Sequence, residues 1–408
     1  MTYIHRSMER KFLRLNDFFK VLLVTGARQV GKTTMLKHLA EGTQRTYVTM
    51  DDLMARELAN RDPVLFFQRY KPPLLIDEIQ KAPGLLEEIK VLCDRSEEKG
   101  LFWLTGSQHF QMMNRVRETL AGRIGILHLY GLSQQEKQGV SFDGETDFSL
   151  ASMIERKAVT KESDIVQVFR HIWEGGLPQV QGVDEELRQA YFSSYIETYL
   201  YRDAADMGGI SDVYKFGRLL RAAAALVSEQ VNYSTLAMAA DVSIPTAKNW
   251  LQVLEGLDII YLLPPFFNNE LKRLAKTPKL YFTDTGLCAY LSMWLTPDTL
   301  MAGAASGHYY ENYVVGELLK SYAAGKEKAN LSYYRDSYGR EIDVVIEADG
   351  RLHPLEIKKA ANPDRREVQK FSLLDKVSLS RGRGGIVCMS RDVMPIDEDN
   401  AFIPSQIL

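Results

Sequence analysis

The chain has 408 residues, of which 25% are charged and 45% hydrophobic, and its formal net charge is −3 with a pI near 6.2. This length accommodates about two to four domains, and no apolar run approaches the roughly 18 to 20 residues that span a bilayer, so we expect no membrane segment. The slightly acidic balance excludes a globally basic nucleic-acid binder, and any nucleic-acid contact must come from local basic patches.

Cys93, Cys288 and Cys388 are far apart and have no C-x-x-C partner. This spacing argues against a disulfide framework and against a zinc site. The first ten residues have no apolar core of signal-peptide length. We therefore expect a cytoplasmic protein.

Residues 1 to about 20 are expected to form an amphipathic helix, which leads into an apolar strand at 21–24. The next segment has the phosphate-loop spacing G-x-x-x-x-G-K-T, and a helix is predicted from Thr34 onward. Backbone N–H groups of such a loop, together with the helix N-terminus, form a nest for phosphate oxygens. Lys32 is expected to reach the β and γ phosphates, and Thr33 to place its hydroxyl on Mg²⁺. The predicted nucleotide-binding residues are Gly26, Ala27, Arg28, Gln29, Val30, Gly31, Lys32, Thr33 and Thr34.

A second strand is expected at 45–50, a helical stretch at 53–70 and a third strand at 74–78 that ends in Asp77 and Glu78. This is the Walker B pattern. Asp77 is predicted to hold the magnesium shell and Glu78 to polarise the attacking water, which favours hydrolysis over binding alone. An acidic strand end at a surface turn is the alternative. The alternation of strands and helices predicts an α/β fold with a doubly wound parallel sheet, the P-loop ATPase domain, over residues 1–140.

A fourth strand is expected at 101–105, and a loop at 119–123 carries Arg123 into a fifth strand. Arg123 is the candidate arginine finger, because a guanidinium neutralises transition-state charge on phosphate better than a lysine does. It could act on its own subunit or on a neighbouring one. A structural salt bridge is the alternative role, and Arg115 and Arg117 compete with it for the finger role.

From 132 to about 161 the sequence turns polar and rich in turn residues, and we place a domain boundary there. Residues 160–228 follow as a helical lid or linker. Within it, Gly175, Gly176, Leu177 and Pro178 form a turn, and helices are predicted at 185–207 and 216–227. This helical segment is expected to cover the nucleotide site.

Residues 229–290 are predicted to form a winged helix, with a helix at 234–240, a turn at 241–243, a second helix, and wing strands at 259–263 and 279–282. The second helix has two faces. Its polar face suits contacts with phosphates and base edges, which predicts DNA binding. The alternative is a helical pair used for packing or for protein contact. The buried stripe comprises Ala247, Trp250, Leu251, Leu254 and Leu257, the polar face comprises Thr246, Lys248, Asn249 and Gln252, and the wing cations are Lys272, Arg273 and Lys276.

Residues 300–408 contain a predicted hairpin with the pattern D…E-x-K, formed by strands at 340–347 and 352–358 and a turn at Asp349 and Gly350. Because side chains alternate along a strand, Glu356 and Lys358 share one face. Asp343 and Glu356 are predicted to hold Mg²⁺ or Mn²⁺, and Lys358 to orient or help deprotonate the water that attacks a phosphodiester. Glu311, on an upstream helix, is the fourth predicted member, and Glu317 is the competing choice.

Between 351 and 383 nine Lys or Arg stand against four acids. Such a local basic excess is what binding of a phosphate backbone requires. Three interpretations stay open for the C-terminal region: a metal-dependent nuclease site, a nuclease-like fold retained only for binding, and an unrelated hairpin.

The whole chain resembles the bacterial and archaeal AAA-like ATPases that carry a conserved C-terminal domain of unknown function. The segments that carry the resemblance are 26–33, 74–78, 104–107, 120–123, 175–178, 195–203, 279–287 and 356–358. The resemblance implies ATP binding, a winged-helix segment and a C-terminal α/β domain similar to restriction-endonuclease-like nucleases. In AAA-like ATPases a polar residue at the end of the fourth strand senses the γ-phosphate. That role falls to Thr105 or Ser107, with Gln108 a weaker choice and a helix N-cap an equal alternative for Ser107.

We therefore expect an ATP-hydrolysing protein, with ATP and Mg²⁺ as cofactors, that couples its nucleotide state to DNA binding or to metal-dependent cleavage. The alternative is a slow ATP-dependent switch that recruits a protein partner and has an inactive nuclease-like domain. A third possibility is an oligomeric remodeller, for which an Arg123 acting on a neighbouring copy is the only indication.

Overall fold

The computed structural model describes residues 3–106, 116, 118–140, 142, 147–208, 210, 212–266, 277–325 and 330–408. It divides into two compact units. The first comprises Met1–Gly131 with Gly256–Asp258, and the second Leu132–Glu255 with Ile259–Leu408. Ser107, Gln108, Arg115, Arg117, Lys272, Arg273 and Lys276 lie outside the described residues.

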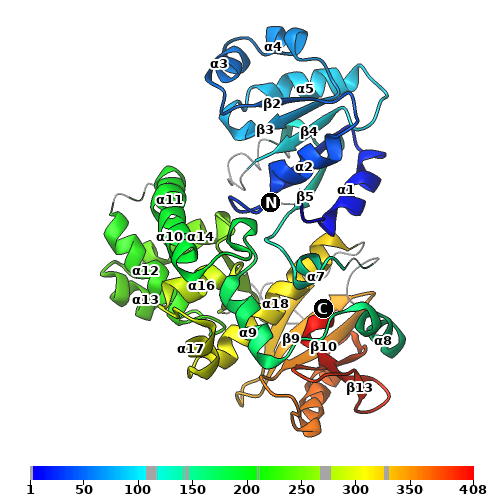
Figure 1. The fold of residues 1–408 in the computed structure, drawn as a ribbon, viewed down its shortest axis with the longest axis vertical. Coiled ribbons are helices and arrows are strands. Elements are labelled where there is room, and N and C mark those ends of the chain that lie inside the picture. Colours follow the sequence, from blue (N-terminus) through cyan, green and yellow to red (C-terminus); the bar gives the residue numbers. More distant parts are fainter. Residues whose placement is uncertain are drawn as a thin grey trace. The chain divides into compact units, whose positions relative to one another are not determined.

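The first unit is built on a five-stranded sheet in the order β2-β3-β4-β1-β5 (Figure 1). All neighbouring strands pair in parallel, which confirms the predicted parallel sheet. Strand β4 lies between β1 and β3, so the carboxyl ends of these three strands meet at one edge of the sheet. The strands are β1 (Val21–Thr25), β2 (Thr46–Thr49), β3 (Leu74–Asp77), β4 (Phe102–Thr105) and β5 (Ile124–His128).

Every residue of β1, β3 and β4 is buried. Such continuous burial is typical of parallel strands that are covered on both faces. The core between sheet and helices includes Leu23, Ile76, Leu104, Phe66 and Ile89. The helices of this unit are α1 (Met8–Asn16), α2 (Lys32–Ala40), α3 (Leu53–Arg61), α4 (Pro63–Arg69) and α5 (Leu85–Asp94), with a 3-10 turn at Ile79–Lys81.

The helical stretch expected at 53–70 consists of two helices, α3 and α4. Asp62 caps the second one by accepting a hydrogen bond from the backbone N–H of Leu65 at 2.9 Å. Pro63 has no N–H to donate to the preceding turn and is tolerated at the first position of a helix. The sequence therefore breaks the first helix at this proline.

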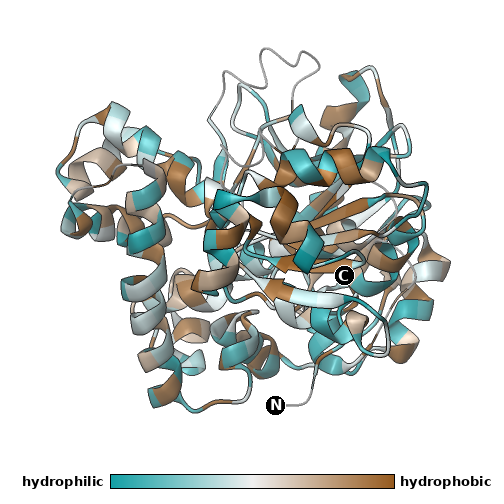
Figure 2. Ribbon diagram, turned by 90° about the horizontal axis from the view of Figure 1, so that it is seen from above, coloured by the Kyte–Doolittle hydropathy of each residue, from teal (hydrophilic) through white to brown (hydrophobic). Residues whose placement is uncertain are grey.

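The second unit begins with helices, and the helical ribbons of the protein mix hydrophobic and hydrophilic residues (Figure 2). The helix predicted at 185–207 runs as α10, a π-helical turn at Ile196–Leu200, and α11. None of the helices that the structure describes is both long and apolar enough to cross a membrane. The helices are α7 (Gln134–Gln138), α8 (Leu150–Val159), α9 (Ile165–Glu174), α10 (Glu185–Tyr195), α11 (Tyr201–Gly208), α12 (Val213–Ala225), α13 (Tyr233–Ala240), α14 (Ile244–Gly256), α16 (Thr285–Leu291), α17 (Pro297–Ala302) and α18 (Ser306–Ala324).

Two sheets complete this unit. Strands β6 (Ile260–Leu263) and β7 (Lys279–Phe282) form an antiparallel pair. The larger sheet has the order β13-β14-β12-β10-β9-β8, with β11 beside β10. Within it β8, β9 and β10 pair antiparallel, and β10, β12 and β14 pair in parallel. Its strands are β8 (Asn330–Arg335), β9 (Glu341–Ala348), β10 (Arg351–Ile357), β11 (Ser380–Arg381), β12 (Gly384–Cys388), β13 (Met394–Pro395) and β14 (Asn400–Pro404), and a 3-10 segment covers Arg365–Lys376.

The predicted hairpin around residues 349 and 350 is confirmed. Ala348 pairs with Arg351, so the connection is a two-residue turn. Asp349 and Gly350 both have positive φ, 49° and 77°. This is the turn geometry whose twist matches that of the flanking strands. Helix α18 packs against β7 and β10, which brings residues from three distant parts of the chain together.

Candidate functional site

The predicted phosphate loop connects β1 to α2 at the carboxyl edge of the parallel sheet. Gly26 and Gly31 have φ values of 140° and 97°, which residues with a side chain rarely adopt. A Cβ at Gly26 would lie 2.1 Å from the backbone oxygen of Leu129. The loop 26–31 therefore depends on glycine at this position, and Lys32, Thr33 and Thr34 form the first turn of α2.

Lys32 is buried in this loop. Its ammonium donates hydrogen bonds to the backbone oxygens of Gly26, at 2.9 Å, and Ala27, at 2.7 Å. Burial lowers the pKa of Lys32 to about 8, against the opposing effect of nearby carboxylates such as Glu78. Its direct partners are neutral carbonyls, so the positive charge is poorly compensated and an anion placed there would be stabilised.

Asp77 accepts hydrogen bonds from three hydroxyl groups that come from three different strands or helices. Thr33 donates to Oδ1 at 2.6 Å, Thr105 donates to the same oxygen, and Tyr47 donates to Oδ2 at 3.2 Å. Burial, followed by the charge of Asp77, raises the pKa of Tyr47 to about 12. The phenol of Tyr47 therefore stays protonated and acts as a donor.

Glu78 follows in a left-handed conformation, with φ 58°, which is uncommon for a residue with a side chain. Its backbone N–H donates to the Thr105 hydroxyl at 3.0 Å, and its carboxylate accepts a hydrogen bond from Gln80. The Thr105 hydroxyl thus joins both acids of the predicted Walker B pair. Left-handed non-glycine residues cluster at active sites, where surrounding contacts hold them.

The residues at this edge fit a magnesium ion and a nucleotide. The Thr33 hydroxyl and the Asp77 carboxylate lie 2.6 Å apart, and hard oxygen ligands of this kind are what Mg²⁺ takes from a protein. The glycine loop, the first turn of α2 and Lys32 provide donors for phosphate beside them.

Arg6 belongs to the same site, although the sequence alone gave no sign of it. It is 7% exposed and donates to the backbone oxygens of Val30, at 2.8 Å, and Tyr130, at 2.7 Å. One guanidinium thus ties the phosphate loop to the segment that follows β5. No local pattern marks such a residue, because its partners lie 24 and 124 positions away.

Arg123 is not brought to the phosphate loop. It precedes β5, and its backbone oxygen accepts a hydrogen bond from Val21, the first residue of β1. Its guanidinium forms two hydrogen bonds with Asp94, at 2.6 and 3.0 Å. The length of β1, roughly 16 Å at ~3.3 Å per residue, separates Arg123 from Gly26. Within one chain Arg123 makes a salt bridge at the opposite edge of the sheet, so the finger role would need a neighbouring copy.

Helices α13 and α14 are joined by a three-residue turn and followed by the β6–β7 pair. Ala247, Trp250, Leu251 and Leu254 of α14 are buried. Lys248, Asn249 and Gln252 are exposed, so the two faces expected of this helix are present.

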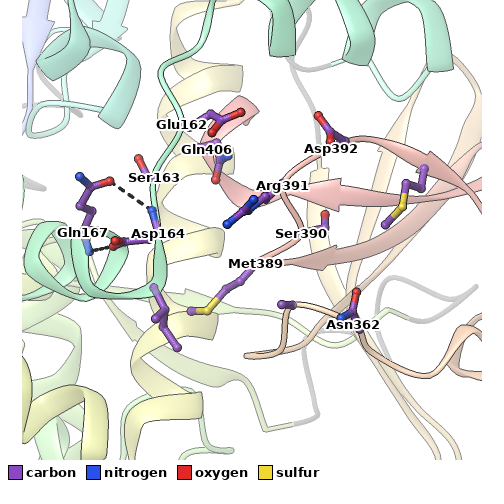
Figure 3. A pocket seen from close by; sticks show the side chains of 13 residues that line it. Glu162, Ser163, Asp164, Gln167, Asn362, Met389, Ser390, Arg391, Asp392 and Gln406 are labelled. Atoms are coloured by element: carbon purple, nitrogen blue, oxygen red, sulfur yellow. Dashed lines mark hydrogen bonds between the residues drawn. The ribbon is translucent and has the colours of Figure 1, made fainter.

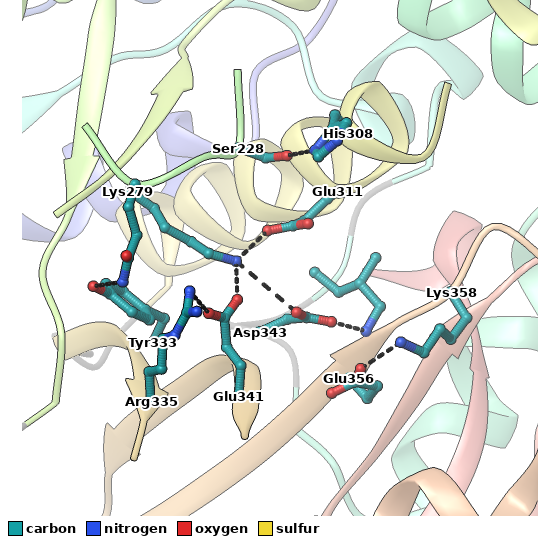
Figure 4. Close-up of polar contacts among 12 residues, drawn as sticks. Ser228, Lys279, His308, Glu311, Tyr333, Arg335, Glu341, Asp343, Glu356 and Lys358 are labelled. Atoms are coloured by element: carbon teal, nitrogen blue, oxygen red, sulfur yellow. Dashed lines mark hydrogen bonds and ion pairs between the residues drawn. The ribbon is translucent and has the colours of Figure 1, made fainter. Parts of the chain in front are cut away.

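The C-terminal region places the predicted acids in two groups (Figure 4). In the first, Glu311 of α18 and Asp343 of β9 lie near Lys279 of β7, at 3.0 and 4.0 Å from its ammonium. Glu341, which precedes Asp343 on the same face of β9, lies 2.5 Å from that ammonium. Tyr281 donates to Glu311 at 2.6 Å, and the backbone N–H of Ile357 donates to Asp343 at 2.8 Å. Sequence reasoning missed Lys279, Tyr281 and Glu341 as members of this group.

The second group is centred on Glu356, which is 1% exposed. Lys358 and Lys370 each lie 2.6 Å from its Oε1, while its Oε2 is buried and has no hydrogen-bond partner within the described part of the chain. Burial and the neighbouring Asp343 raise the pKa of Glu356, and the two lysines act in the opposite direction. The competing candidate Glu317 lies elsewhere, where it binds Lys320 and the backbone N–H of Gln134.

These contacts do not fit a bound divalent ion. Each acid of the predicted metal set is contacted by a lysine ammonium or by a backbone N–H. Among the residues that the structure describes, no group of three or more Asp, Glu, His or Cys side chains has the arrangement of a metal site. Lysine ammonium groups stand where the sequence predicted Mg²⁺ or Mn²⁺.

A separate hollow of about 660 Å³ lies between the start of α9 and the segments that follow β10 and β12 (Figure 3). Arg391 and Gln406 face it, and so do the acids Glu162, Asp164 and Asp392. Its volume suits a small ligand. The mixed charges of its lining favour no single class of ligand, and the hollow plays no part in the function proposed below.

Comparison with known proteins identifies three segments. Residues 18–137 match the model of an AAA domain, residues 166–298 a domain of unknown function (DUF8612), and residues 306–408 a domain of unknown function (DUF4143). The DUF8612 match spans both the predicted helical segment and the predicted winged helix.

The uncharacterized proteins Rv2008c of Mycobacterium tuberculosis and Mb2031c of Mycobacterium bovis are each 27% identical over 392 residues, which cover 95% of this chain and 81% of theirs. Among solved structures, the Walker-type ATPase PABY2304 of Pyrococcus abyssi is 14% identical, with a TM-score of 0.44 over 71% of this chain and 96% of its own. The RuvB Holliday junction branch migration motor of Thermotoga maritima is 16% identical, with a TM-score of 0.30 over 63% of this chain and 86% of its own. Scores this low do not establish a shared fold.

The AAA match spans the phosphate loop, the Walker B pair, Thr105 and Arg123. The chain therefore carries a P-loop AAA-like ATPase domain, followed at its C-terminus by a DUF4143 domain.

Proposed function

We propose that this protein hydrolyses ATP with Mg²⁺ and that its nucleotide state controls nucleic-acid binding by the rest of the chain. The observation that carries the ATPase part is the hydrogen-bonded set of Thr33, Asp77, Thr105 and Glu78 beside the phosphate loop. It places the hydroxyl and the two carboxylates that hydrolysis needs at one edge of the sheet.

The residues divide the work as follows. The loop N–H groups and the first turn of α2 bind the phosphate oxygens, and the charge of Lys32 stabilises them. Thr33 and Asp77 would hold Mg²⁺, which neutralises charge on the phosphates when bound. The Glu78 carboxylate orients the attacking water and accepts its proton. Thr105 keeps both acids in position, and its own contact with the γ-phosphate stays a prediction.

The test is ATP hydrolysis and ATP binding by the full chain and three variants. Lys32→Ala is expected to lose binding, because the phosphates lose their buried cation. Glu78→Gln is expected to bind ATP but to turn over at least ~100-fold more slowly, as loss of a general base does. Lys81→Ala is the control, since it removes a surface lysine that pairs with Asp51. A wild-type chain that neither binds nor hydrolyses ATP would refute the proposal.

The exposed face of α14 supports the nucleic-acid part. Lys248, Asn249 and Gln252 project from the second of two helices joined by a short turn, the arrangement by which a recognition helix enters the major groove. Duplex DNA should bind at low salt and weaken as salt rises, and Lys248→Ala should reduce the salt slope by about 1. Lys81→Ala should leave that slope unchanged. If no duplex DNA binds at low salt, the nucleic-acid part of the proposal is refuted. The alternative, a slow ATP-dependent switch that recruits a protein partner, then replaces it.

We further propose that the C-terminal domain binds nucleic acid without cleaving it. The lysines paired with its acids support this, because they compensate the charge that a catalytic metal ion would otherwise balance. Linear, branched and single-stranded DNA should stay intact with Mg²⁺ or Mn²⁺, with or without ATP. Cleavage that Lys358→Ala abolishes would instead establish a nuclease.

A further inference from the structure

Lys279 is a buried lysine with an unusual set of partners. Its side chain is 6% exposed and comes from β7, whereas its three acidic partners come from α18 and β9. The ammonium lies 3.0 Å from Glu311, 2.5 Å from Glu341 and 4.0 Å from Asp343 (Figure 4). Three carboxylates thus converge on one cation.

The charges of this cluster do not balance. One ammonium faces three carboxylates that are all at least partly buried. Two neutral donors assist it, since Tyr281 donates to Glu311 and the backbone N–H of Ile357 donates to Asp343. Buried carboxylates are stable only when they are paired, hydrogen-bonded or protonated. The cluster therefore needs cations. Arg335 lies 3.4 Å from Glu341, and Lys279 is the cation that lies within 4.0 Å of all three acids.

We propose that Lys279 is the resident cation of the Glu311–Glu341–Asp343 cluster and that it keeps divalent metal ions out. The ammonium is held at the point on which the carboxylates converge, so a metal ion can enter only if the ammonium leaves. This inference concerns the C-terminal cluster and does not rest on the proposed ATP hydrolysis.

The backbone holds Lys279 at this point. It pairs with Leu263 of β6 on one side and forms a bridge with Gln230 on the other. Tyr333 of β8 adds a further link, because its hydroxyl donates to the backbone oxygen of Thr277 at 2.6 Å and accepts from Gln230 at 2.8 Å. These contacts fix the backbone of Lys279, so the ammonium leaves the cluster only by a change of its side-chain rotamer or by a movement of the β6–β7 pair.

The test is a titration of the nucleotide-free full chain with Mn²⁺, in which free Mn²⁺ is followed by electron paramagnetic resonance. The variants are Lys279→Met, Asp343→Asn and the double variant Lys279→Met/Asp343→Asn. Lys320→Met is the matched control, because Lys320 is also a shielded lysine that contacts a buried glutamate, Glu317, at 2.7 Å, and this is its one ion pair among the residues that the structure describes. Binding at the phosphate loop is common to all variants and cancels in the comparison.

Lys279→Met is expected to gain about one Mn²⁺ per chain. The three carboxylates do not have the arrangement of a metal site while the ammonium lies among them, but without it they can draw in around a divalent ion, which accepts oxygen ligands. The double variant should lose this site, and Lys320→Met should gain none. A folded Lys279→Met protein that binds no extra Mn²⁺ overturns the proposal. The wild type gives an independent check if Lys279→Met does not fold: it must bind no more Mn²⁺ than Asp343→Asn does, and an Asp343-dependent site in the wild type also overturns the proposal.

Discussion

Thr105→Val should uncouple the two Walker B acids while leaving the packing intact. Valine has nearly the shape of threonine but no hydroxyl. The Thr105 side chain is fully buried, and its hydroxyl donates to Asp77 and accepts from the backbone N–H of Glu78. After the substitution Asp77 keeps two hydroxyl donors, whereas the Glu78 N–H loses its acceptor. An unsatisfied group of this kind costs about 1–3 kcal/mol, so the free energy of unfolding should fall by that amount.

Catalysis should fall as well, because the left-handed backbone of Glu78, at φ 58°, itself costs about 1–3 kcal/mol and relaxes once its anchor is lost. Since ~1.4 kcal/mol corresponds to a tenfold change in rate, we expect kcat to drop roughly 10- to 100-fold, with a smaller change in the KM for ATP. Urea unfolding and steady-state ATP hydrolysis measure the two effects. Thr160→Val is the control, since it also removes a buried threonine hydroxyl, one that donates to the backbone oxygen of Arg156 in the other unit. A Thr105→Val protein with wild-type kcat and the same unfolding free energy as the control refutes the reasoning.

Four further predictions concern the same domain. Arg6→Met should lower the free energy of unfolding by about 2–4 kcal/mol in urea titrations, because it leaves backbone oxygens on two segments without their charged donor. Gly26→Ala should abolish ATP binding in a fluorescent-nucleotide assay, since its Cβ would lie 2.1 Å from the Leu129 oxygen; normal affinity would contradict this close approach. Burial lowers the pKa of Lys32 to about 8, so from about pH 8 to its unfolded value the unfolded chain binds more protons and stability rises with pH. Urea unfolding should therefore show Lys32→Met as more stable than the wild type at pH 7. The difference between their unfolding free energies should shrink above pH 8, and a difference that does not change with pH would disprove the effect. If Arg123 acts on a neighbouring copy, ATP hydrolysis per chain should rise with protein concentration and Arg123→Ala should remove that rise without altering the rate of the dilute protein.

The nucleotide site could be predicted because its chemistry is local in sequence. The spacing from Gly26 to Thr33 and the pair Asp77 and Glu78 each lie at a strand end, and parallel strands bring such ends to one edge. The partners that complete the site could not be predicted in the same way. Arg6 and Tyr47 reach it across the fold, and neither belongs to a motif. Contacts of this kind depend on packing that no local pattern encodes.

The C-terminal region shows the same limit more strongly. Alternation along the strands correctly predicted the β9–β10 hairpin and its turn. It also led us to expect a metal ion among Glu311, Asp343 and Glu356, whereas lysines pair with acids there. Lys358 lies two positions after Glu356, so the sequence pattern already paired these two residues. Lys279 lies 32 positions before Glu311 in a segment that was assigned to a different domain, so nothing in the sequence placed it in the cluster. The helical stretch expected at 53–70 is present as two helices, and Pro63 begins the second of them.

Lys32 and Lys279 are both buried, and the charges of their partners distinguish a ligand-binding site from an internal contact. Lys32 has neutral carbonyl partners, and burial lowers its pKa to about 8. Burial acts on Lys279 in the same direction, but Glu311, Asp343 and Glu341 together outweigh it and raise its pKa. A phosphate placed beside Lys32 would relieve an uncompensated positive charge, whereas one placed beside Lys279 would meet three carboxylates. The phosphate loop is therefore built to receive an anion, and the C-terminal cluster can exchange its ammonium only for another cation.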